Sequence, residues 1–459
     1  MEMDEAIALL RNENDGFPER EKKKYYVLTF GCQQNEADSE KIKGLCDAMG
    51  YLPGRTPEES DLILVNTCAI REHAELKALS VIGSYKHVKE ENPDLIIGVC
   101  GCMAAEPHRV EDFRKRYPYV TFTVEPGSLH KIPELILTYR EKKRRIFCMG
   151  EGKEIPPIAE GLPVKREWGH RAWVSIMYGC NNFCSYCIVP YVRGRERSRQ
   201  SGEILKETAE LIASGVKDIT LLGQNVNSYR GDCDFADLLK KIDALPGEYI
   251  LRFMTSHPKD VSDKLIETLK ECRHVEPHFH LPLQSGNDRV LSAMNRRYDM
   301  ARYLSVAEKL RLAVPGIALT SDIIVGFPGE TEAEFEDTLT ALQTIRFDSV
   351  YSFIYSPRKG TPAAEREDRV PEEEKGRRFR KLLAVQADIC LEKNKAFEGK
   401  TVRVLCDGLS KADKDNVYSG RTDSGKLVHF IADESDVGRF LPIRVTKAES
   451  FALFGEKAE

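Results

Sequence analysis

The sequence contains no long apolar run. Hydrophobic residues make up 41% of its 459 positions and charged residues 31%, and no stretch approaches the roughly 20 consecutive apolar residues that span a bilayer. The start, MEMDEAIALLRNENDG, mixes charges with only a brief apolar stretch, so it is no secretory signal peptide. These absences exclude membrane-spanning helices and predict a cytoplasmic protein of several domains.

A strong net charge and a disulfide pattern are also missing. The formal net charge of -5 excludes a chain coated in basic residues, but it leaves room for a local basic site that binds nucleic acid. The thirteen cysteines are an odd number. In a chain without a secretory signal they indicate metal ligands and buried thiols rather than disulfides.

One group of three cysteines has no nearby fourth. Cys180, Cys184 and Cys187 stand at C-x-x-x-C-x-x-C spacing, and the next cysteine is Cys233. Electron-transfer clusters are usually closed by four cysteines, whereas three thiolates leave one iron of a [4Fe-4S] cube open for chemistry. A structural zinc would need a distant fourth ligand and usually a second pair of closely spaced ligands. The spacing favours an open iron–sulfur cluster.

Three other cysteines each follow a predicted strand. Residues 25–30, 62–65 and 95–99 are apolar β-rich runs separated by helical stretches, which predicts a doubly wound parallel sheet. Their carboxyl ends meet at one sheet edge, so Cys32, Cys68 and Cys102 are predicted to form a second cluster site there. The alternative is three buried structural thiols. Cys100 lies two residues before Cys102 and is expected to face the same way, but the strand-end argument favours Cys102.

Six further β-runs alternate with helices: 173–177, 219–222, 249–256, 278–283, 318–325 and 349–355. This order predicts a closed or partial parallel (βα)6 barrel, whose chemistry lies at the carboxyl ends of the strands. The polar residues at those ends are either ligand contacts or ordinary turn residues. The candidates for cofactor binding are Gly223, Gln224, Ser256 and Gln284.

A row of arginines follows the three-cysteine motif. Arg193, Arg195, Arg197 and Arg199 alternate, so an extended segment would present them as a one-sided cationic comb. Such a comb suits the phosphate oxygens of RNA. The alternative is a solvated charge run or internal salt bridges, since Glu196 interrupts the row.

The last 60 residues change character. Short β-runs at 401–406, 417–422, 427–432 and 441–445 predict a small β-barrel. It resembles the TRAM module, an RNA-binding barrel. Its charges are nearly balanced, so a structural cap remains the alternative.

The stretch YGCNNFCSYC resembles the hallmark of the radical S-adenosylmethionine superfamily. FGCQQNEADSE, NTCAIREHAELK and GCMAAEP resemble the cysteine motifs of the methylthiotransferase family within it, although Gln34 and Ala105 depart from its commonest residues. The resemblance implies two [4Fe-4S] clusters, on Cys32, Cys68 and Cys102 and on Cys180, Cys184 and Cys187. It also implies S-adenosylmethionine as cofactor, with Tyr186 packing on the adenine. The alternative for Tyr186 is a local core aromatic.

The resemblance implies a domain order and an activity. The domains are a frayed leader (1–23), the auxiliary-cluster domain (24–150), a linker (151–165), the radical barrel (166–395) and a TRAM-like barrel (396–459). LLGQNVNSY and HLPLQSGNDRVL are most similar to family members that add methylthio to carbon 2 of isopentenyladenosine beside the tRNA anticodon. A 5'-deoxyadenosyl radical would remove hydrogen from that carbon.

The implied partners are the tRNA anticodon stem-loop, an electron donor such as a flavodoxin, and a sulfur source, with no membrane. Related enzymes modify threonylcarbamoyladenosine in tRNA or a ribosomal protein, and the residues alone do not distinguish these substrates. A two-cluster electron-transfer protein is the alternative of another class.

Overall fold

The computed structural model describes residues 2–147, 161–167, 169–410 and 416–458. The chain divides into two compact units. The first comprises Met1–Glu167, Tyr178–Asn181 and Cys187–Arg197. The second comprises Trp168–Met177, Asn182–Tyr186 and Ser198–Glu459. The chain therefore passes between the units several times around the three-cysteine motif.

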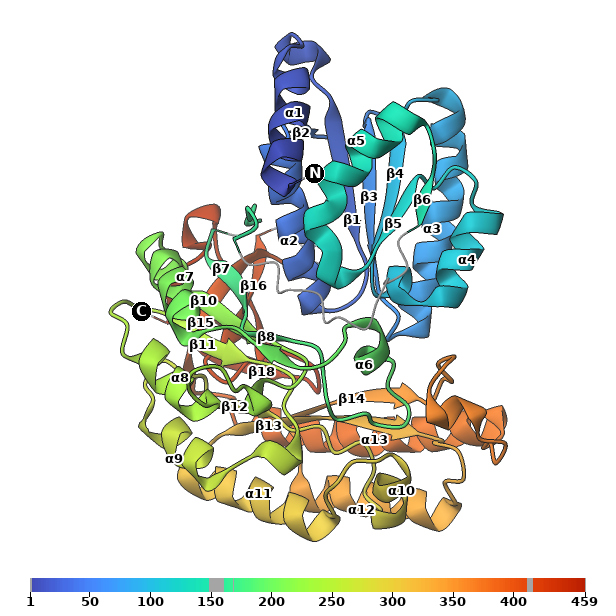
Figure 1. Ribbon diagram of the computed structural model, residues 1–459. Coiled ribbons are helices and arrows are strands. Elements are labelled where there is room, and N and C mark those ends of the chain that lie inside the picture. Colours follow the sequence, from blue (N-terminus) through green and yellow to red (C-terminus); the bar gives the residue numbers. More distant parts are fainter. Residues whose placement is uncertain (1, 148–160, 168, 411–415, 459) are drawn as a thin grey trace. The chain divides into compact units, whose positions relative to one another are not determined.

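The first unit is built on a parallel sheet in the order β2-β1-β3-β4-β5-β6 (Figure 1). The strands predicted at 25–30, 62–65 and 95–99 are confirmed as its three neighbours β1, β3 and β4. β3 and β4 are buried throughout, as expected of inner parallel strands. The strand bounds are β1 Lys24–Thr29, β2 Leu52–Pro53, β3 Leu62–Thr67, β4 Ile96–Gly101, β5 Phe122–Val124 and β6 Ile146–Phe147.

Helices cover both faces of this sheet (Figure 1). One hydrophobic core joins the sheet to α1 (Met3–Asp15), α2 (Gln33–Ala48) and α5 (Ile132–Lys142). A second core joins its other face to α3 (Glu72–Glu91) and α4 (Pro107–Arg116). The predicted doubly wound arrangement is confirmed. Short 3-10 helices are η1 Glu19–Glu21, η2 Cys102–Ala105 and η3 Pro126–Lys131.

The predicted frayed leader is wrong, because most of it forms helix α1. Ala6 and Leu10 lie one turn apart and are fully buried in the first core. Asn14 Nδ2 donates to the carbonyl of Met49 at 2.8 Å, which joins the end of α1 to the end of α2. The few apolar residues of this segment are spaced to cover one helix face, so it packs as part of the domain.

The predicted linker also differs from the structure where it is described. Residues 161–167 lie along α2, with Leu162 buried in the first core. The backbone N–H of Lys165 donates to the carbonyl of Glu40 at 3.0 Å, and Arg166 pairs with the Glu40 carboxylate at 2.7 Å. The first domain thus extends beyond the predicted boundary at residue 150. Residues 151–160 lie outside the described residues.

The second unit contains the six predicted barrel strands as two three-stranded parallel sheets, β11-β10-β7 and β12-β13-β14. A bridge between Leu251 and Val275 and a hydrogen bond from Ser256 to the His280 carbonyl connect them, giving the expected partial barrel. The strands are β7 Arg171–Ser175, β10 Asp218–Leu222, β11 Ile250–Phe253, β12 His278–His280, β13 Ala318–Val325 and β14 Ser349–Ile354.

Helices flank these strands in alternation (Figure 1). They are α7 Ser201–Ala213, α8 Phe235–Asp243, α9 Asp263–Glu271, α10 Asp288–Ala293, α11 Met300–Ala313, α12 Glu332–Ile345 and α13 Glu372–Lys395, with η4 Val226–Ser228, η5 Pro258–Asp260 and η6 Pro362–Glu365. None of the described helices is long and apolar enough to cross a membrane. The short elements around the cysteine motif are β8 Met177–Tyr178, α6 Val189–Val192 and β9 Arg197–Ser198.

The predicted C-terminal β-barrel is confirmed as a closed barrel in the order β15-β16-β17-β19-β18. Lys426 Nζ ties it to the (βα)6 barrel by donating to Asp348 at 3.0 Å and to Asn394 at 2.9 Å. The bounds are β15 Thr401–Leu409, β16 Val417–Thr422, β17 Leu427–Ile431, η7 Glu434–Asp436, β18 Phe440–Ala448 and β19 Leu453–Lys457. The sequence prediction missed β19, which is short and contains a glycine.

The packing of α1 gives a first testable prediction. Leu10→Ala removes a fully buried side chain and is expected to lower the free energy of unfolding by about 2–5 kcal/mol. Leu9→Ala, at a 45% exposed position on the same helix, should change it by less than about 0.5 kcal/mol. Urea denaturation of the full chain, followed by hydrogen exchange in residues 3–50, checks both values. Equal effects of the two variants would contradict the packing of α1.

Candidate active site

The first candidate site lies where β1, β3 and β4 end. Cys32 precedes α2, Cys68 directly follows β3, and Cys102 begins η2 after β4. The thiol of Cys68 interacts electrostatically with that of Cys32, and Cys102 interacts with both. Adjacent parallel strands therefore bring together three cysteines that are about 35 residues apart in sequence, as predicted.

Glycines make this close approach possible. Gly31 has a φ of +122°, and a Cβ atom added there would lie 2.6 Å from Cβ of Cys68. Gly101 has a φ of +90°, and a Cβ atom there would overlap the Asn66 side chain. Larger residues at either position would separate the loops that carry the cysteines.

Asn35 connects these loops. Its side-chain amide donates to the carbonyl of Phe30 at 2.9 Å and to that of Thr67 at 2.8 Å. Cys32 Sγ lies 3.5 Å from the Asn35 amide oxygen, and the backbone N–H of Ile70 donates to Cys68 Sγ at 3.3 Å. Asn35 was not predicted as a site residue. Its position three residues after a strand-end cysteine is the only signal that the sequence offers.

Arg193 is the cation of this site. Its Nη2 donates to Asn35 Oδ1 at 2.9 Å and to Asp38 Oδ2 at 3.0 Å. Burial raises the pKa of Cys102 to about 12 and also raises the pKa of Cys68, and the charge of Arg193 opposes both shifts. Burial opposes the positive charge of Arg193 itself, but Cys102, Asp38 and Cys32 raise its pKa overall.

The donor set fits an anionic iron–sulfur cluster. Three cysteine sulfurs converge, and such ligands bind as thiolates. Within the described part of the chain, the buried Nε of Arg193 has no hydrogen-bond partner. A buried donor of this kind is normally satisfied, so a cluster sulfur or thiolate is the acceptor that matches it.

Cys100 is not equivalent to Cys102. The expectation that both face the same way is wrong, because Gly101 turns the chain before Cys102. Cys100 packs in the core of α1, α2 and α5, beside Cys46, whereas Cys102 packs in the core of α3 and α4. The two thiols therefore lie on opposite sides of the sheet.

The predicted arginine comb is wrong for Arg193, whose side chain is only 4% exposed and directed at Asp38. Arg199 is also used internally, since its Nη1 donates to the Ser175 carbonyl and to Glu207, both at 2.8 Å. Arg195 is exposed, and Arg197 is half-buried. The segment is not one extended strand, because α6 ends at Val192 and Gly194 has a φ of +75°.

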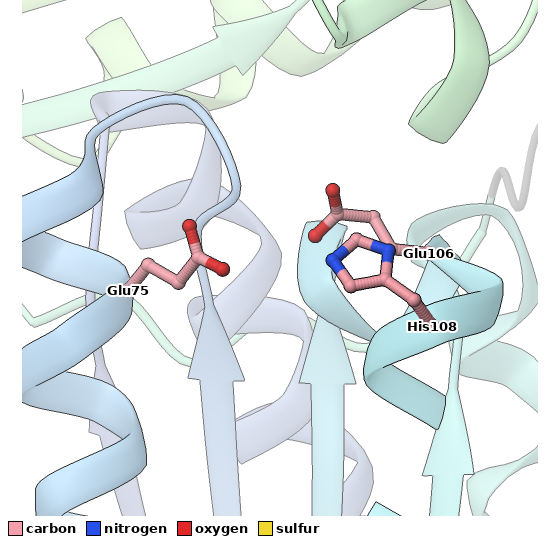
Figure 2. Close-up of side chains that lie close together, drawn as sticks. All are labelled: Glu75, Glu106 and His108. Atoms are coloured by element: carbon pink, nitrogen blue, oxygen red, sulfur yellow. The ribbon is translucent and has the colours of Figure 1, made fainter. Parts of the chain in front are cut away.

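Three more ionisable groups lie near the first site. Glu75 of α3, Glu106 at the start of α4 and His108 of α4 have ligand atoms within 4.8 Å of one another (Figure 2). Carboxylate and imidazole are ligand types for divalent cations. Arg109 Nε donates to Glu75 at 2.6 Å, however, so a guanidinium already compensates part of this charge. The guanidinium of Arg109 therefore balances the charge of Glu75 without a metal ion.

The motif cysteines Cys180, Cys184 and Cys187 are held by local contacts. In the first unit, the backbone N–H of Cys180 donates to the carbonyl of Gly194 at 3.1 Å. In the second unit, Arg296 Nη1 donates to Cys184 Sγ at 3.4 Å and its Nη2 donates to the Pro282 carbonyl at 2.9 Å. Asn295 donates to the carbonyl of Phe183, which has a φ of +49°.

Arg296 was not predicted as a site residue. Burial opposes its charge, but Tyr298, Tyr186 and Cys184 raise its pKa well above the ordinary value. It is thus a permanent buried cation beside one motif cysteine. Tyr186 also packs against Val290, Met294, Phe327, Tyr355 and Ala363, so it is part of a local core. Its contact with adenine stays a prediction.

Hydrogen bonds bring the predicted strand-end residues together. Thr255 Oγ1 donates to the carbonyl of Gly223 at 2.6 Å, which joins the ends of β10 and β11. A Cβ atom on Gly223 would lie 2.5 Å from Met177 Cγ. Ser256 joins the ends of β11 and β12 by its bond to His280. Gln224 is half-buried beside them. This row of polar groups lies where barrel ligands bind.

Gln284 is conformationally unusual. Its φ of +72° lies in the left-handed region that favours glycine, and its side chain is buried. Its Oε1 has no hydrogen-bond partner within the described residues. Beyond the end of β11, burial, then Arg296 and Lys259, lower the pKa of His257, so that its imidazole stays neutral. A strained residue with an unsatisfied polar atom fits a polar ligand such as S-adenosylmethionine.

Family models and relatives agree with this arrangement. The Radical SAM superfamily model matches residues 174–342, the uncharacterized family UPF0004 matches 24–125, and the TRAM domain matches 395–458. A tRNA-2-methylthio-N(6)-dimethylallyladenosine synthase from Acetivibrio thermocellus is 48% identical over 95% of this chain and 91% of its own. One from Clostridium botulinum is 46% identical over 94% and 96%, respectively.

The chain belongs to the radical S-adenosylmethionine methylthiotransferase family. For a member of this superfamily, a [4Fe-4S] cluster and S-adenosylmethionine are implied cofactors. Among solved structures, the radical S-adenosylmethionine methyltransferase TsrM from Kitasatospora setae has a TM-score of 0.56 at 14% identity. The match covers 74% of this chain and 77% of that protein, and it shows a shared fold.

Glu330 of this methylthiotransferase gives a pH-dependent prediction. It accepts from the Gly326 N–H at 2.8 Å and from Arg378 at 3.1 Å, and burial raises its pKa to about 7. Protonated Glu330 stabilises the fold fully below pH 4.5, the pKa of this carboxyl in the unfolded chain. This stabilisation is lost as the pH rises through 7, its pKa in the folded protein. Between pH 5.5 and 8.5, the free energy of unfolding of the native protein should fall by about 1–3 kcal/mol more than that of Glu330→Gln.

Thermal unfolding of the protein at pH 5.5, 7 and 8.5 measures this difference. Glu332→Gln removes a more exposed carboxylate that also contacts Arg378, and it controls for the loss of charge. Parallel pH profiles for the native protein and Glu330→Gln would contradict the raised pKa.

Proposed function

We propose that the protein adds a methylthio group to carbon 2 of isopentenyladenosine next to the anticodon of tRNA, by radical C–H activation. The observation that carries this proposal is the three-cysteine site at the ends of β1, β3 and β4, which accompanies the radical motif in one chain. Relatives whose names specify this tRNA product are 46–48% identical over nearly the whole sequence.

Two clusters are part of the proposal. Cys180, Cys184 and Cys187 would hold the radical cluster, and Cys32, Cys68 and Cys102 would hold the auxiliary cluster. When bound, the radical cluster would supply the electron that cleaves S-adenosylmethionine, and the auxiliary cluster would hold the sulfur that is transferred. Arg193 and Arg296 each place a fixed positive charge beside one ligand set. In the first set, the charge of Arg193 opposes the rise in the pKa of Cys102 and Cys68 that burial causes.

We assign the cofactor to the strand ends of the barrel. Gly223, which packs closely on Met177, lies at the end of β10, and Ser256 and Gln284 place polar groups at other strand ends. Gln224 and Tyr186 complete the proposed contacts. The buried, unpartnered oxygen of Gln284 supports this assignment, because a buried acceptor without a donor is costly.

The tRNA anticodon stem-loop is the proposed substrate. Single-stranded loop bases can be unstacked and bound, which paired bases do not allow without disruption. Among the four arginines, the exposed Arg195 and the half-buried Arg197 are the candidates for phosphate contacts, whereas Arg193 is buried against Asp38 and Arg199 donates to Glu207. The TRAM barrel supports RNA binding by its family. An electron donor such as a flavodoxin, a sulfur source and a cytoplasmic location complete the proposal.

Nucleoside mass spectrometry tests the proposed reaction. Anaerobically reconstituted protein, S-adenosylmethionine and a reductant should convert isopentenyladenosine in tRNA to its 2-methylthio derivative. Formation of 5'-deoxyadenosine without that product would reject this substrate and direct the search to threonylcarbamoyladenosine tRNA or a ribosomal protein. Intact clusters that form neither product would identify an electron carrier instead.

The auxiliary site predicts different effects for two neighbouring cysteines. Cys102→Ala should lose about half of the bound iron and the methylthio product, because it removes one of three ligands of one of two clusters. Cys100→Ala should keep both, since this thiol packs on the opposite side of the sheet. Iron and sulfide analysis of the reconstituted variants decides the point. Iron loss from Cys100→Ala alone would reverse the ligand assignment.

A further inference from the structure

Arg193 comes from the radical motif segment but folds into the first unit. It follows Cys187 by six residues, and the short helix α6 between them inserts Ile188 and Val192 into the core of α3 and α4. The chain therefore carries an arginine from the radical motif to the ends of β1, β3 and β4. The structure places its guanidinium among the auxiliary cysteines.

The arginine is held rigidly there. The side chains of Arg193 and Asp38 are 4% and 5% exposed and lie 3.0 Å apart. Asn35, which connects the cysteine loops, accepts a second bond at 2.9 Å. The guanidinium of Arg193 also interacts electrostatically with the thiols of Cys102 and Cys32. The guanidinium is planar, so its bonds to Asp38 and Asn35 also fix the directions of its five N–H donors.

The charges around the site are unbalanced without Arg193. Three cysteine thiolates bound to a [4Fe-4S] core in its 2+ state leave one negative charge, and one-electron reduction adds another. Asp38 adds a further carboxylate within the same buried region. A fixed cation in a region of low dielectric constant favours the more negative, reduced state of a cluster.

On the basis of the proposed auxiliary cluster, we propose that Arg193 is a positioning residue that sets the reduction potential of that cluster through the buried positive charge that it places beside the cysteine sulfurs. The arginine thereby makes the auxiliary site depend on the segment that carries Cys187. The unpartnered Nε provides a further donor for the sulfur atoms of the cluster. Hydrogen bonds to cluster sulfur and nearby charge are the protein's main means of adjusting such potentials.

The test isolates the auxiliary cluster in the full-length chain. Replacing Cys180, Cys184 and Cys187 together by alanine removes the radical cluster, and potentiometric titration followed by EPR then reports the other one. In this background, Arg193→Gln should lower the ratio of reduced to oxidised cluster about tenfold at a fixed potential. This change corresponds to a midpoint potential that is lower by about 59 mV. Arg193→Lys keeps the charge and should shift the midpoint less.

Arg195→Gln is the matched control. It removes the same charge two residues away, at an exposed position where solvent and salt screen the charge, and should leave the midpoint unchanged. Native midpoints in both Arg193 variants would overturn the inference. So would complete loss of iron from both, because Arg193 would then be required to form the site. Absence of any cluster in the triple-alanine background would instead reject the auxiliary cluster of the proposed function.

Discussion

The parallel register of β1, β3 and β4 is the constraint on which the candidate chemistry depends. Thr29 pairs with Asn66, and Thr67 pairs with Gly101, so the three strands end at nearly the same level. Each cysteine lies within three residues of its strand end. A shift of one strand by a single residue would displace its end, and the cysteine that follows it, by about 3.3 Å along its neighbours. The site is thus fixed by the backbone before any metal is bound.

Both units place a buried arginine beside a cysteine. In the first unit, burial disfavours the thiolate of Cys102 and raises its pKa, and the charge of Arg193 opposes this shift. In the second unit, Arg296 Nη1 lies 3.4 Å from Cys184 Sγ. Both guanidiniums are buried and held by other hydrogen bonds, through Asp38 and the Pro282 carbonyl, respectively. Because arginine stays protonated in such surroundings, the charge is permanent.

The features that depend on the local sequence pattern were predicted from the sequence. The β-rich runs and their strand-end cysteines follow from short-range pattern and from the edge rule for parallel sheets, and the structure confirms the strands. Cys100 was misplaced because strand alternation fails at Gly101, where a φ of +90° changes the direction of the next side chain. The leader was misjudged because only two apolar residues of α1, Ala6 and Leu10, are fully buried.

The arginine row shows why burial is harder to predict than spacing. The alternating pattern of Arg193 to Arg199 is compatible with an exposed comb, and nothing within the segment distinguishes its members. Their different surroundings come from distant residues: Asp38 binds the first arginine, and Glu207 binds the last. α6 and Gly194 turn the chain between them. A pattern that suggested one surface therefore supplies internal charge at both of its ends, while Arg195 in its middle is exposed.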